Sequence, residues 1–145
     1  HETILVVRLD WLWVKINYNF IANNRYFKAQ DPVYQQALAI RLSYSVVELV
    51  TAYFSFRGMP WRGEKKAVEY FQVRDPEYLK VFESVVSAVD PSHKMAAYRE
   101  LFQKALHGEF GEWPEEFVIP LSDQHRYEPK LANFWGDLLG NQPKS

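Results

Sequence analysis

A chain of 145 residues, 48% of them hydrophobic, is long enough to fold as one domain around its own core. It contains no cysteine, which excludes disulfides and thiolate metal sites, and its formal net charge of -1 argues against a general nucleic-acid-binding protein. Since 17% of the residues are aromatic, we expect a core built from large flat side chains.

The first predicted helix extends from about Glu2 to Phe27, where hydrophobic residues recur every three or four positions. We expect Asn23-Asn24 to fray or kink its end. A second helix is predicted to begin at Asp31-Pro32, because aspartate is a good N-cap and proline suits the first helical position. It should end at Gly58.

The second helix is apolar on more than one side. One stripe, which we expect to face the core, consists of Val33, Ala37, Ile40, Tyr44, Val47, Thr51 and Phe54. Because Leu38, Leu42 and Leu49 make the opposite side apolar too, we interpret this helix as the central, most buried one.

Three shorter helices are predicted next: one over about Glu64–Val73, one beginning at Asp75-Pro76, and one beginning at Asp90-Pro91 and closing at Gly108. In the last two we expect the following side chains to face inward: Tyr78, Leu79, Phe82, Val85, Val86, Val89, Met95, Tyr98, Leu101, Phe102 and Leu106. The sequence therefore predicts an all-α antiparallel bundle of five to six helices.

Residues 109–145 are predicted to form an irregular arm packed on the same domain as the bundle of residues 1–108. The arm is acidic and rich in proline as far as Pro129, and we expect Trp113 and Phe117 to anchor it. A strand is possible at Phe117–Ile119, and a last short helix is predicted over about Pro129–Leu139. The apolar run Ile4–Val7 is too short for a secretory signal, and no stretch reaches the ~20 apolar residues of a membrane span. We therefore expect a cytoplasmic protein with no membrane partner.

Most motifs that carry chemistry are missing from this sequence. It has no GxxxxGK[ST], GxGxxG, HExxH or GxSxG pattern, and Ser43 and Ser45 have no histidine at helical spacing. The histidines are scattered at spacings that do not suit a metal, at His1, His93, His107 and His125. We expect no metal site.

One candidate site is the polar line Arg41, Ser45 and Glu48, which share a face of the second helix. Charges on a largely apolar helix must be paired or line a cleft. The structural interpretation is that Ser45 bridges Arg41 and Glu48, or that the first helix supplies their partners. The functional interpretation is that Arg41 and Glu48 contact a polar substrate.

The other candidate site is the cationic turn around Trp61. Residues 1–72 hold nine basic and six acidic side chains, a net charge of +3, and the remainder of the chain has -4. Arg57, Arg62, Lys65 and Lys66 flank a predicted helix N-terminus, where free amides can bind an anion and Trp61 could stack on a base or a sugar. The simpler interpretation is that Glu64 and Glu69 pair with the lysines at the surface.

The order of these segments resembles the C-terminal helical domain of polymerase-β-like nucleotidyltransferases, especially the kanamycin and aminoglycoside type. The resemblance covers about residues 1–113 and is carried by ANNRYFKA, ALAIRLSYSVVELVTAYF, FRGMPWRGEKKAVEYF, RDPEYLKVFESVV and YRELFQKAL. Its most specific piece is Pro60–Lys66. The resemblance implies that Arg41, Glu48 and Trp61 bind an acceptor substrate, and that Arg62, Lys65 and Lys66 approach nucleotide phosphates.

The chain departs from that family in one decisive feature. It has neither the Gly-Ser turn nor the paired carboxylates that hold Mg²⁺ in the catalytic domain, so it cannot supply two-metal chemistry alone. We therefore expect a substrate-binding or lid domain that works with an N-terminal or separate catalytic domain, with Mg²⁺ and ATP bound only in that company.

The bundle also resembles the HEPN group, but the Arg99–His107 spacing is too long for its ribonuclease motif. The alternative function is a non-enzymatic interaction or dimerisation module, in which exposed tryptophans and tyrosines of the arm from Glu109 to Tyr127 bury against a partner or a twin subunit.

Overall fold

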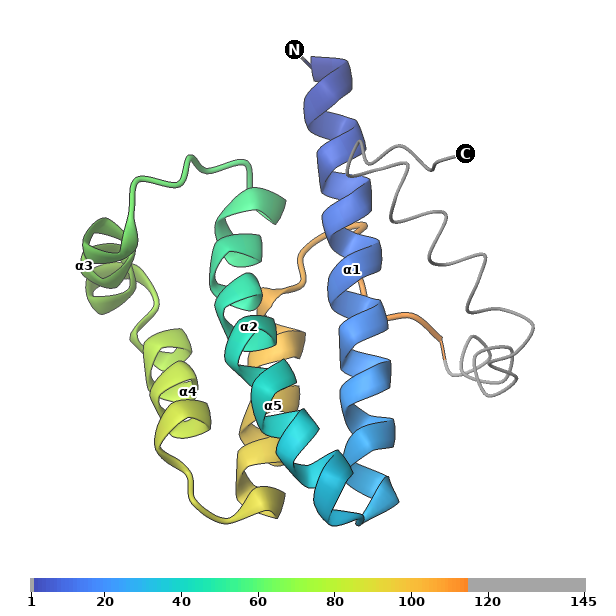
Figure 1. The fold of residues 1–145 in the computed structure, drawn as a ribbon. Helices are drawn as coiled ribbons and strands as arrows, with labels where there is room; N and C mark the ends of the chain where they lie inside the picture. The colour runs from blue at the N-terminus through green and yellow to red at the C-terminus, as the bar shows by residue number, and fades with distance from the viewer. Residues whose placement is uncertain (1, 115–145) are drawn as a thin grey trace, which may run out of the picture. The chain divides into compact units, whose positions relative to one another are not determined.

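The computed structural model describes residues 2–114, with side chains from Leu9 onward (Figure 1). This part of the chain contains α-helices and no strand. The helices are α1 (Glu2–Ala29), α2 (Pro32–Phe56), α3 (Glu64–Arg74), α4 (Pro76–Ser87) and α5 (Pro91–Ala105). The all-α prediction is therefore confirmed. The expected strand at 117–119, the expected last helix and the arm beyond Pro114 lie outside the described residues.

Residues Leu12–Glu112 form one compact unit, and the first turns of α1 fall outside it. Within this unit α1, α2, α4 and α5 run in alternating directions (Figure 1). The backbone of α5 approaches both α4 and α2, and α3 packs against α4.

Three aspartates fix where helices begin, as the sequence predicts. The carboxylate of Asp31 accepts a hydrogen bond from the backbone N–H of Val33 at 2.8 Å. Asp75 and Asp90 accept in the same way at the starts of α4 and α5, at 3.2 and 3.0 Å. Each cap satisfies a backbone donor that the helix itself leaves without a partner.

The core is aromatic. The rings of Phe20 and Phe102 are stacked 4.1 Å apart between α1 and α5. A second cluster joins α2, α3 and α4 through Tyr53, Phe54, Tyr70, Phe71 and Tyr78. The hydroxyl of Tyr78, which is completely buried, donates to the backbone oxygen of Leu49 at 2.8 Å.

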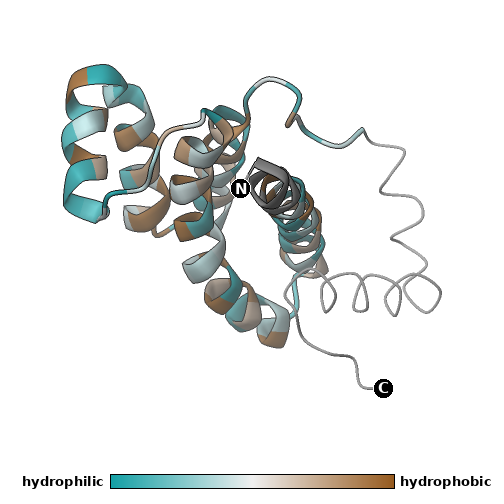
Figure 2. Cartoon of the chain, turned by 90° about the horizontal axis from the view of Figure 1, so that it is seen from above, coloured by the Kyte–Doolittle hydropathy of each residue, from teal (hydrophilic) through white to brown (hydrophobic). Residues whose placement is uncertain are grey.

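The prediction of which face of α2 is buried was right for Phe54 and wrong for most of the other residues of the stripe. The buried hydrophobic side is Leu38, Leu42, Val46, Leu49, Ala52, Tyr53, Phe54 and Phe56. Of the predicted stripe, Val33, Ile40, Tyr44 and Val47 are exposed; we call these four residues the outer stripe. Figure 2 shows hydrophobic residues, in brown, along α2, and periodicity could not tell which side of such a helix the bundle covers.

Two smaller expectations were also wrong. Helix α1 does not fray or kink at Asn23-Asn24 but continues to Ala29, and Asn23 is completely buried. In α4, Val86 is exposed, as is Val89 beyond its end, whereas Val81 takes an inward position.

By length and composition, α2 could cross a membrane, contrary to the expectation that no stretch suffices. Core helices of soluble proteins pass the same test, so this is a weak indication.

Candidate functional site

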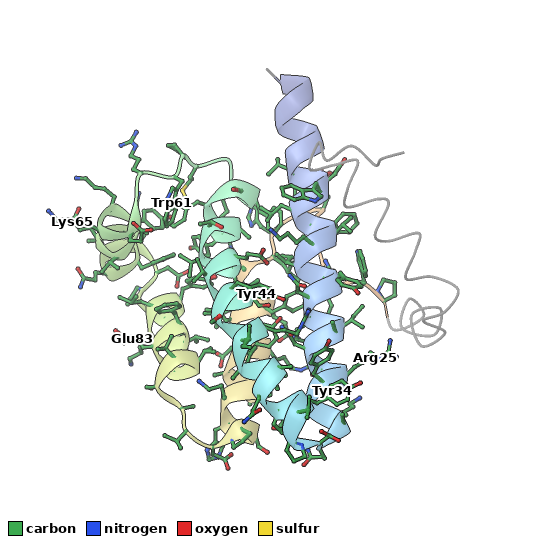
Figure 3. All side chains as sticks on the ribbon, in the orientation of Figure 1. Arg25, Tyr34, Tyr44, Trp61, Lys65 and Glu83 are labelled. Carbon is green, nitrogen blue, oxygen red and sulfur yellow. The ribbon has the colours of Figure 1, made fainter. Side chains whose placement is uncertain are left out.

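The two candidate sites lie on different sides of α2. Arg41 and Glu48 lie on the side of α2 next to α1, whereas Trp61 belongs to the turn that leads to α3 (Figure 3). Arg41 is 20 residues before Trp61 in the chain, and α2 places it about 20 Å along the helix axis from Phe54. The structure therefore does not bring Arg41, Glu48 and Trp61 into one cleft.

Residues of α1 are the partners of both charged side chains of the polar line, Arg41 and Glu48. Arg41 donates from Nε to Oδ1 of Asn23 at 2.6 Å and from Nη2 to Oδ1 of Asn19 at 2.9 Å. Glu48 accepts at Oε1 from Nδ2 of Asn19 at 3.1 Å, and its Oε2 lies 2.5 Å from Nζ of Lys15. Asn19 thus connects Arg41 with Glu48, using its oxygen for one and its nitrogen for the other.

The network continues into α5. The side-chain nitrogen of Asn23 donates to Oγ of Ser45 at 3.1 Å and to the hydroxyl of Tyr98 at 2.9 Å. Asn23, Ser45 and Tyr98 are all buried. Burial raises the pKa of Tyr98 well above its ordinary value of 10.0, so this hydroxyl stays neutral. We call the set Asn19, Asn23, Arg41, Ser45, Glu48 and Tyr98 the polar network.

The polar network matches the structural interpretation in which the first helix supplies the partners. The guanidinium of Arg41 also lies over the ring of Tyr26, 5.2 Å from its centroid. A substrate that used Arg41 or Glu48 would have to displace contacts already made inside the bundle. The sequence analysis missed Asn19, Asn23 and Tyr98; the signal was a pair of asparagines four residues apart within an apolar helix face.

The turn between α2 and α3 forms a pocket. Gly58 and Gly63 have φ values of 70° and 101°. Residues other than glycine seldom adopt this backbone conformation. Between these glycines the chain folds back, and the ring of Trp61 meets that of Phe54 edge-on, 5.6 Å apart. The resulting pocket has a volume of about 240 Å³. This Trp61 pocket is lined by Phe54, Met59, Pro60, Trp61, Arg62, Lys66, Ala67 and Tyr70.

The four cations of this region have different roles. Arg62 and Lys66 line the Trp61 pocket, whereas Lys65 does not and projects outward from α3 (Figure 3). The expected surface pairing takes the form of Lys66 with Glu69, 3.6 Å apart and exposed. Such a pair contributes little and leaves Lys66 available for another anion.

The side chain of Arg57 makes structural contacts within the bundle. Its guanidinium lies 3.7 Å from the centroid of the Tyr53 ring and donates to the backbone oxygens of Lys104 and Ala105 at 3.0 Å each. These are the last carbonyls of α5, so Arg57 caps that helix from α2.

Within residues 2–114 no group of three or more histidine, aspartate or glutamate side chains is placed to hold a metal ion. Comparison with known protein families, with curated proteins and with solved structures finds no match for this chain. The resemblance to nucleotidyltransferase helical domains therefore stays a hypothesis.

Proposed function

We propose that this domain binds a ligand that carries an aromatic ring and a phosphate, such as a nucleotide, through the Trp61 pocket. One observation carries the proposal: two cations, Arg62 and Lys66, line the same pocket as the rings of Trp61 and Tyr70. A ring can stack on the aromatic wall while the cations meet the phosphate. A volume of about 240 Å³ is below the roughly 300–1,000 Å³ of pockets that enclose a larger ligand, so the pocket would hold the ring, and the phosphate would lie at its edge beside Arg62 and Lys66.

In this proposal the domain acts as the substrate-binding or lid part of a nucleotidyltransferase. It positions the nucleotide, and a catalytic domain supplies the carboxylates, Mg²⁺ and the chemical step. Lys65 contributes only to the surrounding positive potential. Arg41 and Glu48 hold the helices together, and the acceptor substrate binds elsewhere.

The test is a titration of tryptophan fluorescence with ATP, without metal. We expect quenching that disappears in Trp61→Phe and an affinity at least tenfold weaker in the double variant Arg62→Ala, Lys66→Ala. The matched control is Arg74→Ala with Lys80→Ala, two exposed cations outside the pocket. Adenosine and tripolyphosphate, titrated separately, measure the ring and phosphate contributions. Absence of ATP binding, or equal binding by the double variant and its control, overturns the proposal.

A non-enzymatic interaction module is the second candidate, and the outer stripe of α2 favours it. Monomeric proteins rarely leave a large apolar face uncovered. The arm residues first expected to make such contacts lie largely outside the described part of the chain.

A further inference from the structure

The outward side of α2 carries no charge. Every exposed residue of this helix from Pro32 to Val47 is uncharged, since Arg41 turns toward α1. The outer stripe includes Val33, 72% exposed, Ile40, 68% exposed, and Val47, 57% exposed. Exposed aliphatic side chains are ordinary one at a time, but a row of them along one uncharged helix face is typical of a contact surface.

The apolar surface extends from the outer stripe to α4. A groove of about 480 Å³ lies beside the stripe, and Val47 is part of its wall together with Val86 and Val89 from the other side. Val86 and Val89 are 60% and 93% exposed. A stable interface of standard size takes ~800 Å² from each partner, so the contact needs the outer stripe and the two valines beside it together.

We propose that this face, the outer stripe with Val86 and Val89, binds a second copy of the same chain across a two-fold axis. The proposal rests on the second candidate function, the interaction module, and not on ligand binding at the Trp61 pocket. Identical faces meet in a two-fold dimer, so the lack of charged residues among the exposed ones of α2 from Pro32 to Val47 avoids placing like charges opposite one another at the axis.

The spacing of the outer stripe suits such an axis. Ile40 is seven residues from both Val33 and Val47, so an antiparallel pair of α2 helices centred on Ile40 places Val33 of one copy opposite Val47 of the other. Residues seven apart on a helix share a face, which keeps all three in the contact. The antiparallel arrangement also sets the positive end of each helix dipole beside the negative end of the other.

The first test is sedimentation equilibrium of the full 145-residue chain across the micromolar range. We expect a mass near twice the 17.1 kDa of one chain. Ile40→Lys should halve that mass, because it places two ammonium groups at the axis. The matched control, Val73→Lys, changes a valine on α3 that is 78% exposed and off this face, and should leave the dimer intact. Thermal melting by circular dichroism checks that both variants fold.

Cysteine cross-linking tests the register, because the chain has no cysteine of its own. Ile40→Cys should form a disulfide-linked dimer on mild oxidation, and Val73→Cys should not. Val33→Cys and Val47→Cys should cross-link when mixed and much less when each is alone. A monomer at all concentrations overturns the proposal, as does a dimer that Ile40→Lys leaves intact. Either result leaves the ATP titration unaffected, so failure here and failure at the Trp61 pocket are separate outcomes.

Discussion

Nε of Arg41 lies 2.6 Å from Oδ1 of Asn23, and this hydrogen bond joins the middle of α2 to α1. Asn23 is fully buried, so its oxygen has no access to water that could replace the guanidinium. Nη2 of the same arginine serves the buried Asn19. One positively charged group thus satisfies two buried amide oxygens.

Removing that group should destabilise the fold. We expect Arg41→Ala to lower the free energy of unfolding by about 1–3 kcal/mol, since a buried acceptor left without a donor costs about that much. Urea unfolding followed by circular dichroism measures the change. Lys28→Ala, an exposed residue at the end of α1, is the control and should stay within about 0.5 kcal/mol of the wild type. An equal stability of Arg41→Ala and wild type would reopen the assignment of Arg41 to substrate binding.

Asn23→Ala should lower the free energy of unfolding at least as much, because Asn23 forms hydrogen bonds with Arg41, Ser45 and Tyr98. We expect a loss of about 2–4 kcal/mol, from partners left unsatisfied and from the small cavity. The matched control is the neighbouring Asn24→Ala. Asn24 donates only to the backbone oxygen of Phe20 in its own helix, at 2.7 Å, so its loss should be clearly smaller. The prediction fails if the two variants unfold at the same urea concentration.

Alanine variants of Arg57 and Arg62 should show that the first arginine contributes to stability and the second to ATP binding. Arg57→Ala removes a guanidinium that caps α5 and packs on Tyr53, so we expect a loss of about 2–3 kcal/mol. Arg62→Ala, in the exposed turn, should change stability by less than about 0.5 kcal/mol. Thermal melts of both variants beside ATP titrations provide the comparison. A stable Arg57→Ala variant would contradict the capping role.

The protein should lose stability in strong alkali. Burial raises the pKa of Tyr78 and of Tyr98 above the value of 10.0 expected in the unfolded chain. Their stabilising contribution is therefore complete below pH 10, and it declines above that pH because the unfolded chain releases protons that the folded chain retains. Together Tyr78 and Tyr98 contribute about 2.7 kcal/mol per pH unit to the slope, and Tyr53, whose pKa is raised by burial and by its hydrogen bond to Asp75, adds to it.

Urea unfolding at successive pH values above 9 measures that slope, and tyrosinate absorbance of the folded chain measures the ionisation directly. Tyr98→Phe should reduce the slope by about 1.4 kcal/mol per pH unit, because one buried hydroxyl is removed. If all nine tyrosines of the folded chain ionised together near pH 10, buried Tyr78 and Tyr98 would not be protected, and the prediction would fail.

The starts of α2, α4 and α5 could be predicted from the sequence because their causes are local. Asp31, Asp75 and Asp90 each satisfy a donor two or three residues ahead, and the proline that follows each has the φ that a helix start requires. Nothing distant in the chain is needed to read such a signal.

The burial of α2 could not be predicted in this way. Helix α2 is apolar on several sides. Whether Leu42 or Ile40 is buried therefore depends on where α1, α4 and α5 lie. Fold-level packing, which a single sequence does not state, decided it. Local propensity also misjudged Asn23, a poor helix former that is retained because three partners surround it.

For the candidate sites, the sequence predicted which residue types take part but not which partners they contact. Sequence spacing placed Arg41 and Glu48 on one face of a helix but did not reveal Asn19, which reaches both from α1. In the cationic turn, spacing grouped Arg57 with Arg62. In the structure Arg57, at the end of α2, reaches α5, whereas the turn after Gly58 carries Arg62 to the Trp61 pocket.

The polar network also determines the register of α1 against α2. Aliphatic contacts would tolerate a slide of one helical turn, about 5.4 Å, because another apolar side chain arrives at nearly the same place. Hydrogen bonds do not tolerate it: because Asn19 and Asn23 are one turn apart, a slide would leave Arg41 beside only one of them and would break the other bonds of the polar network. The asparagines of α1 thus select one alignment from several of similar hydrophobic content, and this uniqueness is what a domain needs if it is to present a surface or a pocket in a fixed place.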